Sequence, residues 1–147
     1  MSDSPITCQR LDDDKIAYCA ASEILALNAP YSKMSFGVIS VTLAGQIRRG
    51  RYFLAMQDGR PVGYTGWAYV DEDKTRAWID GGGAPSYQEC LNGDAAVLMT
   101  VYAKSSAAKR ALIHALRNEG RGRKVLFHRS YNGEKDRSRN NEVRVIS

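Results

Sequence analysis

Two histidines, His114 and His128, are the side chains of this sequence best suited to accept a proton near neutral pH. His128 directly follows residues 124–127, an apolar run that predicts a β-strand, so its imidazole could face a site as a general base. The alternative is a half-buried strand histidine that hydrogen-bonds the backbone. His114 lies in a helical pattern, which favours a surface or packing role.

The three cysteines, Cys8, Cys19 and Cys90, are far apart and form no Cys-x-x-Cys pair. Cys90 has no neighbouring histidine to activate it, which makes it a weak nucleophile candidate. An odd number of cysteines without metal-type spacing predicts free thiols, no bound metal and a cytoplasmic location. Residues 1–5 lack the basic and apolar regions of a secretory signal, which leads to the same expectation.

Basic residues are concentrated in the C-terminal part of the chain. Residues 117–147 hold nine Lys and Arg against four Asp and Glu, which accounts for the whole net charge of +5. Such a segment indicates an anionic partner, which could be a nucleic acid, a phosphate-bearing cofactor or an acidic carrier protein; a solvated basic face is the alternative. The cluster Arg121, Arg123 and Lys124 is the candidate anion-binding group. No nucleic-acid-binding signature accompanies the charge, so we expect nucleic acid least.

Hydrophobic periodicity predicts the elements that must position these residues. Helices are expected after Asp12–Asp14, with Ile16, Ala20, Ile24 and Leu27 as the apolar stripe, and after a Ser35 cap, with Phe36, Ile39, Leu43 and Ile47 as the stripe. An antiparallel meander is expected over 51–80, with strands at 51–56, 62–70 and 75–80 and an Asp-Gly turn at 57–60. A Gly-rich loop at 81–85, helices at 94–103 and 106–118, and strands at 124–127 and 143–146 complete the order.

This order is typical of one α+β domain, with helices packed on a mostly antiparallel sheet. The 147 residues suit a single domain over 1–147, in which 130–147 form a polar basic tail with a terminal strand. The longest uncharged stretch, residues 34–47, has 14 residues, whereas a membrane span needs about 20. We therefore expect no membrane span.

Several segments, in order, resemble the RTX-toxin-activating lysine acyltransferases. Residues 51–68 (RYFLAMQDGRPVGYTGWA) resemble the strand, turn and Trp-Ala strand at the core of that family. Residues 78–85 (WIDGGGAP) resemble its Ile-Asp-x-x-Ala-Pro segment, with one extra residue. Residues 28–48 resemble its first loop and helix, and 125–136 its late strand and polar exit. The resemblance covers about residues 25–137.

The resemblance implies a fold related to the Gcn5-type acetyltransferases and an enzyme of the bacterial cytoplasm, commonly a dimer. It implies transfer of a fatty acyl chain from an acyl-carrier protein, or from acyl-CoA as the related donor, to a lysine ε-amine of a protein substrate. That amine has a reference pKa of about 10.4, so its attack on a thioester requires a base. The family uses a His after the first helix together with an Asp of the Ile-Asp segment.

The resemblance maps the Asp onto Asp80 and the His onto Ser32. Asp80 also suits a plain turn at a strand end. A serine hydroxyl accepts no proton at neutral pH without another group to relay it, so the base must differ from the family's. His128 or a water chain could replace it.

Three hypotheses follow. The chain is an acyltransferase with an altered base, for which Asp80, Ser32 and His128 are the catalytic candidates. Alternatively, it keeps the fold without the chemistry and serves as a structural or interaction subunit, for example in a phage or mobile-element assembly. The third, a nucleic-acid-binding domain, rests on charge alone.

Overall fold

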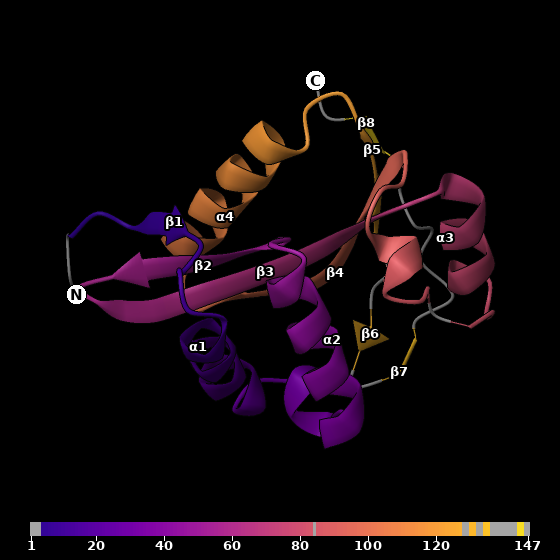
Figure 1. Ribbon diagram of the computed structural model, residues 1–147. Helices are drawn as coiled ribbons and strands as arrows, with labels where there is room; N and C mark the ends of the chain where they lie inside the picture. The colour runs from indigo at the N-terminus through magenta and orange to yellow at the C-terminus, as the bar shows by residue number, and fades with distance from the viewer. Residues whose placement is uncertain (1–3, 84, 128–129, 132–133, 136–143, 146–147) are drawn as a thin grey trace.

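A mixed β-sheet with strand order β1-β2-β3-β4-β5-β8 forms the centre of the molecule (Figure 1). The computed structural model describes residues 4–83, 85–127, 130–131, 134–135 and 144–145. Neighbouring strands are antiparallel except β4 and β5, which are parallel. The strands of this sheet are β1 Thr7–Gln9, β2 Tyr52–Gln57, β3 Arg60–Val70, β4 Ala95–Ala103, β5 Lys124–Phe127 and β8 Arg144–Val145.

Side-chain caps begin three of the four α-helices. Asp13 accepts from the Lys15 and Ile16 N–H groups, Ser35 from that of Val38 and Ser105 from that of Ala108. The predicted first and second helices, the Ser35 cap and the helix expected at 106–118 are therefore confirmed. The α-helices are α1 Asp14–Ala26, α2 Phe36–Arg48, α3 Glu72–Ile79 and α4 Ser106–Glu119, and the 3-10 helices are η1 Tyr31–Lys33 and η2 Gln88–Cys90.

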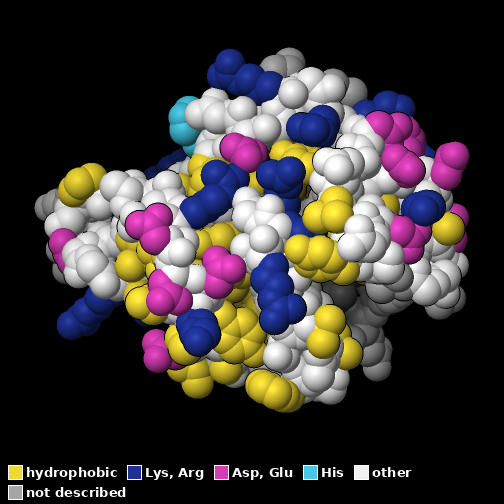
Figure 2. All heavy atoms as spheres, viewed as in Figure 1, with side chains coloured by type: hydrophobic (Ala, Val, Ile, Leu, Met, Phe, Trp, Pro, Cys, Tyr) yellow, Lys and Arg dark blue, Asp and Glu magenta, His cyan; other side chains and the backbone are white. Residues whose placement is uncertain are grey.

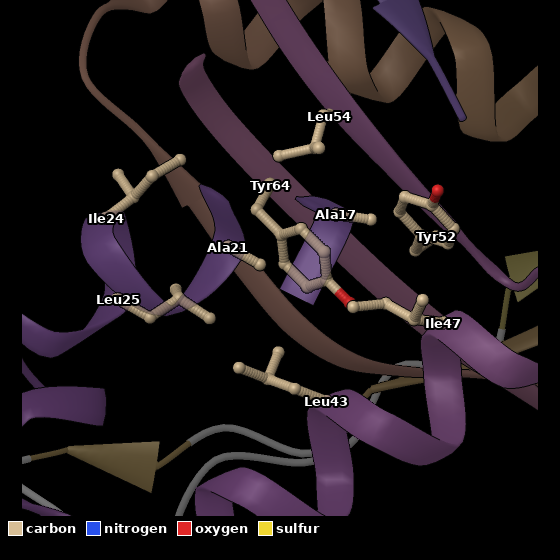
Figure 3. Close-up of a cluster of buried hydrophobic side chains, with 9 residues drawn as sticks. All are labelled: Ala17, Ala21, Ile24, Leu25, Leu43, Ile47, Tyr52, Leu54 and Tyr64. Atoms are coloured by element: carbon tan, nitrogen blue, oxygen red, sulfur yellow. The ribbon is translucent and has the colours of Figure 1, made fainter. Parts of the chain in front are cut away.

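Helices cover both faces of the sheet (Figure 1). α1 and α2 lie on one face, where the Tyr64 ring packs among side chains of both helices (Figure 3). α4 lies on the other face, where its Leu112 packs with Phe53, Trp67 and Val125. This arrangement confirms the predicted α+β class with a mostly antiparallel sheet.

The apolar stripes predicted for α1 and α2 are right in part, because Ile24, Leu43 and Ile47 are buried. Ile16 and Leu27 are exposed, Leu27 by 84%, while Ala17, Ala21, Ile24 and Leu25 are buried. Phe36, the first residue of the stripe predicted for α2, is also exposed, whereas Leu43 and Ile47 are buried as expected. The small Ala17 and Ala21 side chains let α1 approach the sheet closely. The packing gained by this close approach outweighs the burial of the larger Ile16 and Leu27 side chains.

The predicted hairpin of β2 and β3 is confirmed, but the third strand predicted for the meander, at 75–80, is wrong. Gln57 and Arg60 pair across Asp58 and Gly59, which both have positive φ as a tight hairpin turn requires. Residues 75–80 instead fall mostly in α3, where Glu72 and Asp73 occupy the first turn and Arg76 forms an i,i+4 ion pair with Glu72. The alternating pattern of so short a segment concealed the helix.

The helix predicted at 94–103 is also wrong, because those residues form β4. Apolar residues fill this strand except at Thr100, as is usual for a strand of a sheet covered on both faces, and such a run cannot be told from a buried helix by periodicity. β4 is thus the third antiparallel strand of the meander, and α3 and η2 lie in the connection that precedes it.

The C-terminal tail is described only in part. Ser130–Tyr131 (β6) pairs with Glu134–Lys135 (β7), where an irregular loop was predicted. Arg144–Val145 pairs with the start of β5, which agrees with the strand predicted at 143–146 as far as its residues are described. In the part of the chain that the structure describes, every helix is too short or too polar to cross a membrane.

Candidate active site

The described pairing between β4 and β5 covers only half of β4. Pairing with β5 covers Ala95 to Leu98, and β4 then continues to Ala103 with β3 as its only strand neighbour among the described residues. We call residues 95–98 the paired half of β4 and 99–103 its open half. An extra residue, Met99, stands at the junction, because Gly66 pairs with Thr100 and Trp67 with Leu98.

The loop after α1 lies against the open half. The Tyr31 hydroxyl accepts the Val101 N–H at 2.8 Å and donates to the Val101 carbonyl at 3.0 Å. Both groups of Val101 therefore point away from β3, as alternate residues of an antiparallel strand do. Burial raises the pKa of Tyr31, which keeps the phenol protonated and able to donate.

Ser32 follows Tyr31 in η1 and is exposed. Its N–H donates to the Asn28 carbonyl at 3.0 Å, which closes the turn after the cis Ala29–Pro30 bond. The predicted site residue Ser32 is thus carried by the same short turn whose Tyr31 holds the β4 edge.

A buried polar network lies beneath this edge. The Tyr64 hydroxyl donates to Gln46 Oε1 at 2.7 Å, and Gln46 Nε2 donates to Thr100 Oγ1 at 3.0 Å. The Gln46 amide fits because residue 66 is glycine, since a Cβ there would overlap Gln46 Oε1. Burial, followed by the nearby Tyr52, raises the pKa of Tyr64. The network fixes α2 to the open half of β4.

Asp80, the predicted carboxylate, lies elsewhere than expected. It ends α3 as an exposed C-cap residue, and its N–H donates to the Arg76 carbonyl at 2.9 Å. The neighbouring Trp78 packs against a cluster that includes Ala68 and Val97, away from the Tyr31 contact. Within the described residues, the side chains of Asp80 and Ser32 form no hydrogen bond or ion pair with each other or with other groups.

Of the two histidines, the structure describes His114 alone. His128 lies outside the described residues. His114 is exposed on α4, the opposite face from α1 and α2, and its Nε2 lies 3.3 Å from Asn118 Nδ2. The predicted surface role of His114 agrees with this position.

The predicted anion-binding cluster is divided among three partners. Arg121 donates to Asn118 Oδ1 at 3.0 Å, Lys124 forms a 3.0 Å ion pair with Glu72, and Arg123 lies over the Tyr69 ring at 3.9 Å from its centroid. Hydrogen bonds from Arg76 and then Lys124 hold the pKa of Glu72 below its usual range. The three cationic groups do not converge on one point.

Sequence reasoning missed Tyr31, Gln46 and Thr100. Tyr31 bonds to a residue 70 positions away, which no local pattern announces. A signal did exist for Gln46, because it is a polar residue on the buried stripe of an apolar helix, one position before Ile47, and Gly66 interrupts a strand of large residues. A polar residue and a glycine of this kind mark a buried hydrogen-bond network.

No group of three or more His, Cys, Asp or Glu within the described ranges has the arrangement of a metal site. The arrangement offers instead a backbone edge with outward N–H groups, which is the kind of donor that stabilises a developing oxyanion. Beside it lie one phenol, one exposed serine and a satisfied amide–hydroxyl network.

Comparisons with known proteins address the family. A search of solved structures finds a histone acetyltransferase HPA2-related acetyltransferase from Corynebacterium glutamicum, with 18% identity, 84% of this chain and 76% of that chain covered, and a TM-score of 0.49. The curated proteins contain no match to the sequence. The model of the RTX toxin acyltransferase family matches residues 20–145, most of the chain. The chain therefore belongs to the RTX toxin acyltransferase family.

Proposed function

We propose that this acyltransferase moves an acyl group from an acyl-carrier thioester to the ε-amine of a lysine on a protein substrate. The family assignment supports acyl transfer over the structural-subunit alternative and over nucleic-acid binding. Within the structure, the observation that carries the proposal is the Tyr31–Val101 contact, because it sets the Ser32 turn on an open backbone edge. Acyl-CoA is the alternative donor.

The open half of β4 is our proposed seat for the thioester. A tetrahedral intermediate places negative charge on the former carbonyl oxygen, and backbone N–H groups aimed at that oxygen stabilise it. Val101 and Ala103 are the residues of the open half that pair with β3 at non-hydrogen-bonded positions, so their peptide groups turn outward. The leaving thiolate takes a proton, and the attacking amine loses one.

Asp80, Ser32 and His128 remain the proposed catalytic residues. Ser32 would contact the amine or relay its proton, since its turn lies at the open half. Asp80 would carry the charge that balances the protonated base, and this role requires α3 or the bound acceptor to bring the carboxylate toward Ser32. His128 would be the base if it faces the same edge.

The basic end of α4 and the start of β5 would bind the donor's carrier. Arg121, Arg123 and Lys124 are our proposed residues for the acidic surface of a carrier protein or the phosphate of its pantetheine arm. Their division among three partners suits a broad acidic surface better than a single phosphate.

The experiment is acyl transfer followed by mass spectrometry. The purified chain is incubated with an acylated carrier protein and a protoxin of the type the family modifies, and intact masses of carrier and protoxin are recorded. We expect the carrier to lose its acyl group while one protoxin lysine gains it. The proposal would be rejected if the carrier kept its acyl group to the same extent as in a reaction without enzyme, and if acyl-CoA also failed to donate. Ser32→His tests the base, because an imidazole with a pKa near 6.5 should raise the rate.

A further inference from the structure

Three arginines cover an aromatic surface on the α4 face of the sheet. This surface consists of Phe53, Trp67 and Tyr69. Arg10 lies over Phe53, with its guanidinium carbon 4.5 Å from the ring centroid. It also donates to Glu119 Oε1 and to the Gly50 carbonyl, each at 2.8 Å. Arg10 thus has an aromatic face, a carboxylate and a carbonyl as partners.

Arg51 and Arg123 share one ring and lack such partners. Their guanidinium carbons lie 4.6 and 3.9 Å from the Tyr69 ring centroid. The distance between the two guanidinium carbons therefore cannot exceed the sum of these two distances. Both residues are half-buried. Across the described ranges, neither guanidinium forms an ion pair or a hydrogen bond. Two like charges held this close repel each other, and the ring quadrupole offsets only part of that repulsion.

The carboxylates nearby serve other groups. Ala95 pairs with Lys124, so Asp94 lies abreast of Arg123, but Asp94 Oδ1 accepts the Glu72 N–H at 2.9 Å. Glu72 itself is paired with Arg76 and Lys124. Among the described residues, acids therefore pair with Arg10 and Lys124 and none pairs with Arg51 or Arg123.

The Tyr69 hydroxyl adds a third donor. Tyr69 as a whole is 4% exposed, and its hydroxyl forms no hydrogen bond with a described residue. The hydroxyl oxygen is not itself fully buried, so it reaches solvent. Two guanidinium groups and a phenol thus lie around one ring, and no acceptor among the described residues pairs with them. One guanidinium is enough for a carboxylate, whereas two with a hydroxyl match the several oxygens and higher charge of a phosphate.

We propose that Arg51, Tyr69 and Arg123 form a binding site for the phosphate group of a phosphate ester. The site is separate from the open half of β4, since Tyr69 pairs with Ala96 in the paired half, whereas Val101 pairs with Thr65. It does not depend on the proposed acyl transfer. The ester could be the pantetheine arm of the donor or a free phosphorylated metabolite, which share this chemistry.

The test is a titration of the full chain with inorganic phosphate at constant ionic strength, followed by NMR signals of arginine Nε–Hε groups and tyrosine rings. We expect saturable shifts at Arg51, Arg123 and Tyr69. Arg51→Gln and Arg123→Gln should each weaken binding about tenfold, as expected for loss of a charged hydrogen bond. Tyr69→Phe keeps the ring and should weaken binding severalfold, and Arg110→Gln, the matched control, which removes an exposed charge on α4, should leave it within about twofold.

Two further ligands identify the source of the phosphate. Tighter binding of 4′-phosphopantetheine than of inorganic phosphate, with no shift from pantetheine alone, would support the site and assign it to the donor arm. Equal binding of simple phosphate esters would support the site and assign it to a free metabolite. Shifts that do not saturate, or that Arg110→Gln reduces as much as Arg123→Gln, would overturn the proposal, because they indicate diffuse screening by surface charge.

Discussion

The two halves of β4 differ in what satisfies their second edge. In the paired half, β5 supplies a regular parallel ladder from Ala95 to Leu98. In the open half, the Tyr31 hydroxyl is the partner of both polar groups of Val101 among the described residues, and the Thr100 side chain accepts from the Gln46 amide. A strand partner leaves no backbone group for a substrate, whereas a side chain can move away from one. This difference is the reason why we propose the open half as the place of the chemistry.

The largest expected effect tests whether a residue outside the open half takes part. Asp80→Asn keeps the shape of the side chain and removes its charge, so we expect acyl transfer to slow by on the order of 10²-fold with little loss of stability. Asp73→Asn, on the same helix, is the control and should change the rate by less than about twofold. Equal rates for the two variants would confine the active site to the open half and remove Asp80 from it.

The next effect concerns the packing beneath the open half. Gly66→Ala inserts a methyl group where Gln46 Oε1 lies, so we expect unfolding free energy to fall by about 2–3 kcal/mol in urea titrations. Gly37→Ala in α2 is the control, because nothing lies within 4 Å of the new Cβ and alanine favours helix by about 0.5–1 kcal/mol. A Gly66 variant as stable as the wild type would show that the Gln46 network is not what joins α2 to β4.

Loss of the Tyr31 hydroxyl should weaken the open half selectively. Tyr31→Phe leaves the Val101 N–H and carbonyl without their partner, at a cost of about 1–2 kcal/mol. Native-state hydrogen exchange should then speed up at Val101 and not at Val97 in the paired half. The matched control, Tyr18→Phe, removes a half-buried hydroxyl bond to Ser40 elsewhere. Unchanged exchange at Val101 would mean that Tyr31 merely rests on the edge.

The smallest effect is a pH dependence. Burial raises the pKa of Tyr64 in the folded state, while an unfolded tyrosine titrates near 10. Its contribution to stability is therefore fully present below about pH 10 and is lost as pH rises above it, by at most about 1.4 kcal/mol per pH unit. Tyr64→Phe should make the alkaline decline in unfolding free energy shallower by about one proton. An identical slope in the variant would contradict the burial of an un-ionised phenol.

Local chemistry in the sequence was enough for the elements with strong caps and turns. The Asp13, Ser35 and Ser105 caps and the Asp58–Gly59 turn act within a few residues, so their helices and hairpin were predicted. β4 and α3 were exchanged in type because periodicity in short segments is ambiguous until neighbours are known. The buried face of α1 depends on how closely the sheet can approach Ala17 and Ala21, which tertiary packing decides.

Of the candidate site, the sequence predicted only the turn that holds Ser32. Ser32 could be placed after the first helix, because Asn28–Pro30 ends that helix. Its position against Val101 follows from a contact across the sheet, and the network of Gln46 with Thr100 spans 54 positions. Asp80 was expected at the end of a strand, and its actual place at the end of α3 follows from the acidic first turn of that helix.

The most direct test of the central claim, that the acyl thioester lies along the open half of β4, is hydrogen-exchange mass spectrometry with a bound carrier. The full chain is mixed with a carrier protein whose acyl group is attached through a non-cleavable amide in place of the thioester, so that binding is observed without turnover. The account predicts slowed exchange in residues 28–34 and 99–103, with residues 95–98 unchanged because β5 already protects them. Hydrophobic side chains are also exposed on α1 and α2, as Figure 2 shows, so a carrier could bind there instead. Protection confined to α3, or to the exposed faces of α1 and α2 with none at 99–103, would contradict the claim.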